Sequence, residues 1–231
     1  MRKIAAKMKD EVAEAEENVI DVRKDDKTIA KFTIPFENYV WPIVTINTVS
    51  LLLNGTPTDK KIGIELRKTD HCIIHGPNGI GKSTLLKRLV NAHDDNAMIH
   101  DGVKVWYYSQ DFSALDLDMV VRDALHEMSN AITDQEVYRV ASGFLLQWDV
   151  LKNPISYMSE WQKALLCYAR FVIQQPHLLI LDEPTNHVNF RHLPVIAQAI
   201  NDFAGAVVMV CHDDAFVWEL QGFDHIDLLK L

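Results

Sequence analysis

A glycine-rich stretch at positions 76–84 constrains the fold of this chain more than any other feature. The apolar run Cys72–His75 precedes it, and the run Leu85–Val90, which has helical spacing, comes after it. The stretch matches G-x-x-x-x-G-K-[ST] at every defined position, and strand, loop and helix is the context that this pattern requires. We therefore expect a phosphate-binding loop. Its residues are Gly76, Pro77, Asn78, Gly79, Ile80, Gly81, Lys82, Ser83 and Thr84.

The residue types in this loop suit the phosphates of a nucleotide. Glycines let the backbone bend and point its N–H groups at an anion. A helix that begins near Gly81 directs its positive end at the same place. Lys82 supplies a charge for the β- and γ-phosphates, and the Ser83 hydroxyl can bind Mg²⁺.

The composition narrows the class of protein. The chain has 231 residues, 48% of them hydrophobic and 24% charged, which allows one or two globular domains. Its net charge of −9 argues against direct binding of DNA or of an anionic membrane. Cys72, Cys167 and Cys211 lie far apart among apolar residues, which is typical of a reducing compartment. Without a long apolar run or a signal-like N-terminus, we expect no membrane span and a cytoplasmic location.

The first 26 residues differ in pattern from the rest. Apolar residues recur at steps of three and four, which indicates one apolar stripe on a helix with charged faces. This segment is either a solvated surface helix or the end of a longer helical arm, and the charged residues 21–27 connect it to the remainder of the chain. The stripe consists of Ile4, Met8, Val12, Ala15 and Val19.

An antiparallel β layer is predicted after the connector. The stretches Thr28–Pro35, Val40–Leu53 and Lys61–Leu66 are rich in residues that favour strands, and Asn54–Pro57 is a turn signal.

A buried parallel sheet is predicted in the rest of the chain, because apolar strands alternate with helices there. Asp118 or Thr133 could cap the first of these helices, and Thr133 would form a capping box with Glu136. The predicted strands are Val103–Tyr108, Leu178–Leu181 and Ala206–Cys211, and the predicted helical stretches are Val120–Trp148 and Ser159–Ile173.

Two carboxylates come directly after the strand Leu178–Leu181. A buried parallel strand would deliver them at its carboxyl end, where α/β sheets bind ligands. Asp182 could then hold Mg²⁺, and Glu183 could polarise a water in line with the γ-phosphate.

With these residues in place, the chain resembles a known family. Asp182–His187 resembles the E-P-T-N-H motif of ABC ATPases of the F subfamily, and Gln110, which closes a strand, resembles their Q-loop glutamine. Met158–Lys163 stands at the signature position, and His212 matches the switch histidine. The resemblance implies a P-loop NTPase fold of the ABC type over residues 27–231. That fold has a mixed or parallel α/β sheet core, an antiparallel β layer and a helical subdomain at about 111–165.

The resemblance also implies roles for single residues. Glu183, His212 and Gln110 would be catalytic, and Ser83, Gln110 and Asp182 would hold Mg²⁺. ATP would bind to the loop at 76–84. Ser159 would contact the nucleotide of a partner domain in trans.

This sequence departs from the family pattern at several points. Glu160 and Trp161 replace signature glycines, which predicts weaker closure and a negative charge near the partner's phosphate. Asn189 replaces an aspartate. No tyrosine for stacking on adenine occurs near Leu52, which puts base selectivity in doubt, and three aromatic residues could substitute for it. They are Phe36, Tyr39 and Trp41.

Members of the F subfamily carry two ABC domains joined by a helical linker, and many act on the ribosome. The resemblance therefore implies an ATPase half that acts in translation and pairs head to tail with a second ABC domain, in a copy of itself or another chain. The N-terminal arm would be the end of the linker, in a tandem protein, a natural half protein or a fragment. Two alternatives remain open: the ATP-binding subunit of an ABC transporter, and a nucleotide-gated binding module with little turnover.

Overall fold

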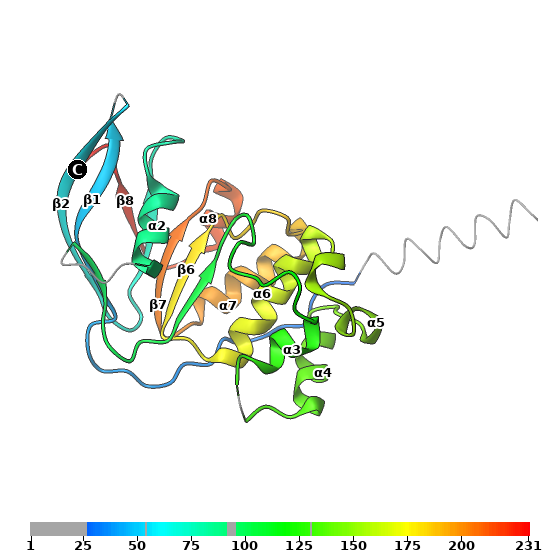
Figure 1. Cartoon of the computed structure of the whole chain (residues 1–231). Helices are drawn as coiled ribbons and strands as arrows, with labels where there is room; N and C mark the ends of the chain where they lie inside the picture. The colour runs from blue at the N-terminus through cyan, green and yellow to red at the C-terminus, as the bar shows by residue number, and fades with distance from the viewer. Residues whose placement is uncertain (1–26, 54, 92–95, 130) are drawn as a thin grey trace, which may run out of the picture.

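The computed structural model describes residues 27–231 apart from 54, 92–95 and 130. The helical arm expected at residues 1–26 lies outside the described residues. In Figure 1, one helix lies between two sheets, and a group of helices lies against the opposite face of one of these sheets.

The centre of the molecule is a five-stranded parallel sheet of order β5-β6-β7-β3-β8. Every residue of β6 and β7 is buried, as their continuous apolar sequence predicts for a parallel sheet covered on both faces. The strands are β3 (His71–His75), β5 (Val105–Tyr108), β6 (Leu178–Asp182), β7 (Ala206–Val210) and β8 (Phe223–Asp227).

Alternate residues of these strands enter two different cores. Leu179 and Leu181 of β6 pack into a core that the group of helices completes. Leu178 and Ile180 pack into a second core with α2 (Lys82–Asn91) and the antiparallel sheet. The helices of the first core are α3 (Val121–His126), α4 (Asp134–Gly143), α5 (Trp148–Leu151), α6 (Glu160–Gln174), α7 (Leu193–Asn201) and α8 (Asp214–Glu219), with short 3₁₀ turns at η1 (Ile155–Tyr157) and η2 (Phe190–His192).

The antiparallel sheet has the order β2-β1-β4, which confirms the predicted β layer. Its bounds differ from the prediction, because β1 begins only at Val44 and the second strand already begins at Thr56. Pairing of Leu53 with Thr56 closes the hairpin, so Thr56 and Pro57 belong to the ladder and not to the turn. The strands are β1 (Val44–Leu53), β2 (Thr56–Leu66) and β4 (Ala97–Ile99).

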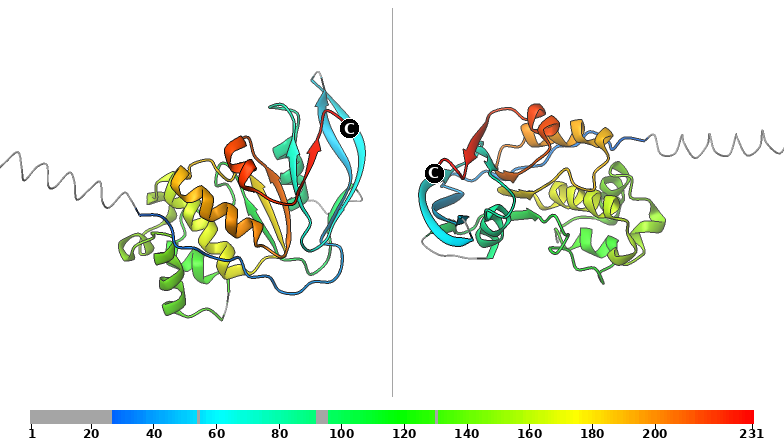
Figure 2. Two further views of the ribbon diagram at one scale, coloured as in Figure 1. Left: turned by 180° about the vertical axis from the view of Figure 1, so that it is seen from behind. Right: turned by 90° about the horizontal axis from the view of Figure 1, so that it is seen from above.

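The strand predicted at Thr28–Pro35 is wrong. This segment is irregular and runs along the back of the molecule across the helices, as Figure 2 shows in blue. Ile29 and Ile34 are buried in the helical core, and the Ala30 N–H donates to the Gly143 carbonyl at 2.8 Å. The apolar residues of this segment pack on helices. Because no strand of the described residues pairs with it, the segment forms no β ladder.

The predicted helices agree with the structure better than the predicted strand at Thr28–Pro35 does. Residues 120–148 form α3, α4 and the beginning of α5, and α4 starts with the capping box of Thr133 and Glu136. Asp118 caps nothing, because α3 begins one residue after Val120. Ser159 is the N-cap of α6. The sequence did not predict α7, α8, β4 or β8.

Candidate nucleotide-binding site

The loop at 76–84 connects β3 with α2, as predicted. Gly79 and Gly81 have φ angles of 79° and 115°, a region that favours glycine. A Cβ on Gly81 would lie 3.0 Å from the Ser50 carbonyl of β1, and the Leu52 N–H donates to the Ile80 carbonyl at 2.9 Å. The loop is therefore held against β1, and its curvature depends on glycine.

Lys82 is folded back into this loop. Its Nζ donates to the Gly76 carbonyl at 2.7 Å and to the Pro77 carbonyl at 3.1 Å. Burial lowers the pKa of Lys82, and the charges of Glu183 and Asp182 oppose that shift. An ammonium that is held in the loop by neutral carbonyl oxygens is well placed to bind an anion there.

Ser83 and Asp182 meet where the loop joins the sheet. The Ser83 Oγ donates to the Asp182 Oδ1 at 3.1 Å, and Asp182 is 2% exposed. Burial raises the pKa of Asp182, which the hydrogen bond from Ser83 partly offsets. A hydroxyl and a buried carboxylate at one point are hard oxygen ligands, so the donor set fits Mg²⁺.

Glu183 is held by the chain after β7. Its Oε2 accepts the backbone N–H of His212 at 3.0 Å, and its Oε1 lies 3.4 Å from the His212 Nε2. Its own N–H donates to the Val210 carbonyl at 2.8 Å, and its φ of 54° is left-handed. Burial raises the pKa of Glu183, and the hydrogen bond from the His212 N–H opposes the rise.

A cleft of about 630 Å³ joins these groups. The structure brings Gln110, Lys82, Ser83, Glu183 and His212 together at it, while Ile80 of the loop points into the core. Sequence reasoning missed Asn186 and Val210, although Asn186 stands in the motif at 182–187. The lining residues are Leu52, Asn78, Gly79, Gly81, Lys82, Ser83, Thr84, Gln110, Glu183, Asn186, Val210 and His212.

The expectation that Phe36, Tyr39 or Trp41 substitutes for the stacking tyrosine is wrong. Phe36 packs on His177 and Phe203, and the Tyr39 hydroxyl donates to the Asp101 carbonyl. Trp41 is 73% exposed and away from the cleft lining. Among the described residues, an aliphatic side chain, the half-exposed Leu52, stands at the cleft instead.

The residues at the signature position lie outside the cleft. Ser159 is exposed at the start of α6, where its N–H donates to Gln162 Oε1 at 3.0 Å. The Glu160 carboxylate contacts His187 of the same chain, with Oε2 2.8 Å from Nδ1. The Asn189 side chain accepts the Arg191 N–H, so it caps η2.

No helix among the described residues is long and apolar enough to span a membrane.

The family model described as ABC transporter matches residues 60–186. ATP-binding cassette sub-family F member 2 of Bos taurus is 33% identical over 81% of this chain and 31% of its own length. Sub-family F member 3 of Mus musculus is 27% identical over 85% of this chain and 28% of its own. This chain thus spans less than a third of these relatives.

Solved structures show the same fold. An ABC transporter in an inward-facing conformation superimposes with a TM-score of 0.59 at 21% identity, over 78% of this chain and 76% of that one. A model of ribosome-bound archaeal Pelota and ABCE1 matches with a TM-score of 0.58 at 17% identity, over 83% of this chain and 33% of that one. The chain therefore belongs to the ABC transporter family, as an ABC ATPase domain whose relatives include sub-family F members.

Proposed function

We propose that this chain binds Mg²⁺ and ATP in the cleft and hydrolyses the nucleotide as one half of a two-domain ATPase. The observation that carries the proposal is the convergence of four side chains on one cleft, with the Asp182 carboxylate bonded to one of them, Ser83; the other three are Lys82, Glu183 and His212. Lys82 and the loop N–H groups hold the phosphates. Ser83 and Asp182, with Gln110 at the same cleft, would hold Mg²⁺, which would supply positive charge for the β- and γ-phosphates.

Glu183 acts as the general base in this proposal. Its carboxylate reaches the cleft next to His212, and the raised pKa makes it a better proton acceptor than an ordinary carboxylate. Glu183 takes a proton from the attacking water, and His212 contacts the γ-phosphate. The Glu183 carboxylate is fixed before the substrate arrives, because the His212 N–H already holds it.

The second half of the site would come from another ABC domain. Ser159 lies outside the cleft of its own chain, which supports a contact in trans with the nucleotide of a head-to-tail partner, either a second copy or another chain. Residues 27–231 form the ATP-binding domain in this proposal, with about 111–165 as its helical subdomain and 1–26 as the end of a linker. A role in translation at the ribosome is part of the proposal, because the sequence resembles the F subfamily and one matching structure is of a ribosome-bound ABCE1.

The test compares ATP hydrolysis and ATP binding in the wild-type chain and Glu183→Gln. Removing a general base should lower turnover by about 10²–10⁴-fold while the chain still binds ATP. Glu219→Gln, a change of the same kind in α8, serves as the control and should leave turnover unchanged. If the wild-type chain does not bind ATP, or if Glu183→Gln hydrolyses it at the wild-type rate, the proposal is wrong.

A nucleotide-gated binding module is the second candidate function. The charge of Glu160 and the bulk of Trp161, at positions where the family usually has glycine, favour it. Under this alternative, ATP binds and promotes association with a partner domain, whereas turnover stays at background in the wild-type chain at every chain concentration.

A further inference from the structure

The turn from Glu183 to His187 is held in an unusual conformation. Glu183 and His187 have φ angles of 54° and 63°, and neither is a glycine. A left-handed conformation at such residues persists only where the surroundings hold it. Two of the residues in this turn, Glu183 and Asn186, line the cleft. The geometry of the cleft therefore depends on what holds the turn.

The first part of the turn is fixed by buried groups. The Tyr168 hydroxyl of α6 donates to the Pro184 carbonyl at 2.9 Å, and the Tyr108 hydroxyl of β5 donates to the Asn186 carbonyl at 3.3 Å. Both tyrosines are fully buried. Residues 184–186 are thereby tied to α6 and the sheet through the core.

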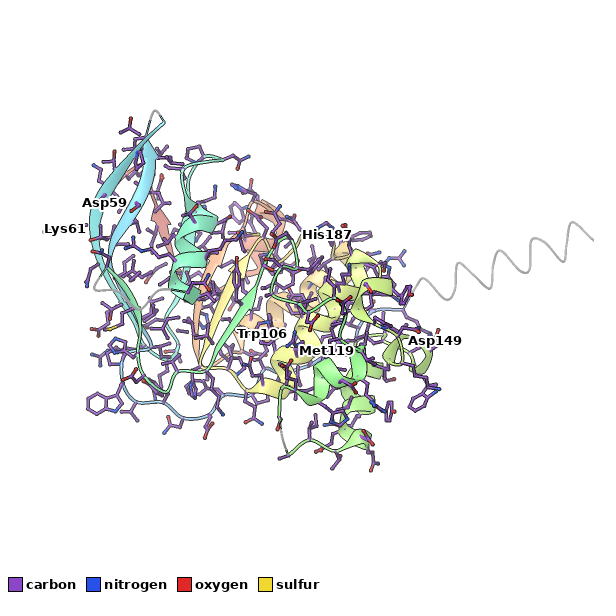
Figure 3. All side chains as sticks on the ribbon, in the orientation of Figure 1. Asp59, Lys61, Trp106, Met119, Asp149 and His187 are labelled. Atoms are coloured by element: carbon purple, nitrogen blue, oxygen red, sulfur yellow. The ribbon has the colours of Figure 1, made fainter. Side chains whose placement is uncertain are left out.

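The last residue of the turn is held near the surface. The His187 ring packs on Phe112 with the ring centroids 5.5 Å apart, and its Nδ1 lies 2.8 Å from the Glu160 Oε2. Figure 3 labels His187 on the side of the sheet toward which the strand arrows point. Glu160 stands in the first turn of α6, the helix that also holds Pro184 through Tyr168. Helix α6 therefore contacts the turn at two points, Pro184 and His187.

We propose that Glu160 is a positioning residue: its carboxylate holds His187, the last residue of the turn, and thereby helps to keep Glu183 and Asn186 in place at the cleft. The inference rests on the proposed ATPase function of that cleft. A glycine at position 160 could make no such contact. Glu160 therefore does more than place a charge at a partner surface; it acts on the site of its own chain.

The pair makes only a small contribution to global stability. The Glu160 and His187 side chains are 68% and 34% exposed, and ion pairs in such positions contribute little to the free energy of unfolding. Removing Glu160 should therefore loosen the turn without unfolding the chain. A local change without a loss of global stability distinguishes a positioning role from a general structural one.

The chain contains a close match for a control. His126 and Asp134 form another histidine–carboxylate pair, 2.7 Å apart, with side chains 31% and 70% exposed. This pair joins α3 and α4 and has no contact with the cleft lining. Asp134→Ala removes the same type of pair at the same exposure as Glu160→Ala.

Hydrogen exchange of the backbone at residues 183–189 tests the inference in the dilute chain without nucleotide. We expect Glu160→Ala to speed exchange there by about two- to fivefold, because exchange depends on local opening and an exposed pair contributes little free energy. Asp134→Ala should leave exchange at the wild-type rate. Glu160→Gln keeps an oxygen that can accept a hydrogen bond from His187, so exchange in this variant should stay slow. Wild-type exchange in Glu160→Ala, or equal acceleration in Asp134→Ala, overturns the inference.

Kinetics give a second readout. Glu160→Ala should lower kcat by about two- to fivefold, because loosening of the turn slightly misplaces catalytic groups. Its Kd for ATP should stay within about twofold, because the loop at 76–84 binds the phosphates independently of the turn. A wild-type chain that neither binds nor hydrolyses ATP would contradict the proposed function, while the exchange experiment would still decide the role of Glu160.

Discussion

The Ser83 hydroxyl donates to the Asp182 carboxylate at 3.1 Å, across 99 residues of sequence. This contact joins the loop to the end of β6 before any ligand binds. Since a hydroxyl and a carboxylate that share a cation act as a unit, we expect Ser83→Ala and Asp182→Asn each to weaken the Mg²⁺ dependence of ATP binding.

The two effects should not add, with a coupling of about 0.5–3 kcal/mol in a double-mutant cycle. Titration of Mg²⁺ at fixed ATP measures this coupling. Asp227→Asn, on the edge strand β8, is the control. An unchanged Mg²⁺ requirement in Asp182→Asn would show that these two residues hold no metal.

Leu52 should make the cleft tolerant of different bases. A half-exposed aliphatic side chain buries part of any base but offers no ring for stacking. We expect competition assays to give ATP and GTP affinities within about tenfold of each other. Leu52→Tyr should improve purine binding by about 1–3 kcal/mol, the range of base–aromatic stacking. A strong preference for ATP in the wild-type chain would contradict this interpretation.

Gly205 should not tolerate a side chain. A Cβ there would meet the Phe203 ring and would lie 2.5 Å from the His177 carbonyl, which is backbone and cannot move aside freely. Gly205→Ala should therefore destabilise the chain by about 1–3 kcal/mol, the usual cost of overpacking. In Gly143→Ala, the nearest atom would be the Ala30 Cβ at an ordinary 3.7 Å, so urea unfolding should show a far smaller change.

His177 should lower the free energy of unfolding as the pH falls below neutral. Its Nδ1 accepts the Lys104 N–H at 2.9 Å, and burial lowers its pKa below the ordinary 6.5, with the Lys104 charge acting in the same direction. A histidine that is neutral when folded contributes stability that is complete above pH 6.5 and is lost as the pH falls toward the lowered value.

His177→Asn keeps an acceptor for Lys104 but cannot titrate, so its stability should depend less on pH. Urea unfolding between about pH 7.5 and about pH 5.5 measures the difference. Equal pH dependence in both chains would exclude His177 as a source of the effect.

The sequence predicted the features that short segments determine. The loop at 76–84, the strands β6 and β7, and the residues Asp182, Glu183 and His212 are indicated by local motifs and continuous apolar runs. The strand at Thr28–Pro35 was predicted wrongly because composition favours extended chain without supplying a neighbouring strand. The edge strand β8 was missed because it mixes apolar with charged residues and depends on pairing with β3.

Parts of the site were beyond local patterns. The hydrogen bond between Leu52 and Ile80 places β1 at the cleft, and it results from packing of two sheets rather than from either segment alone. The contact between Glu160 and His187 depends on where α6 begins relative to β6. Side-chain contacts of this kind depend on the three-dimensional arrangement of distant segments.

The position of β3 in the parallel sheet has a consequence for how the chain comes to be folded. Its two neighbours, β7 and β8, come much later in the chain, and the hydrogen bond between His71 and Gly205 spans 134 residues. Pairings between such distant segments form slowly, because a long loop must close first. The ribosome therefore releases the nucleotide-binding loop long before its strand can be paired, and until then the apolar β3 is exposed to association with other chains.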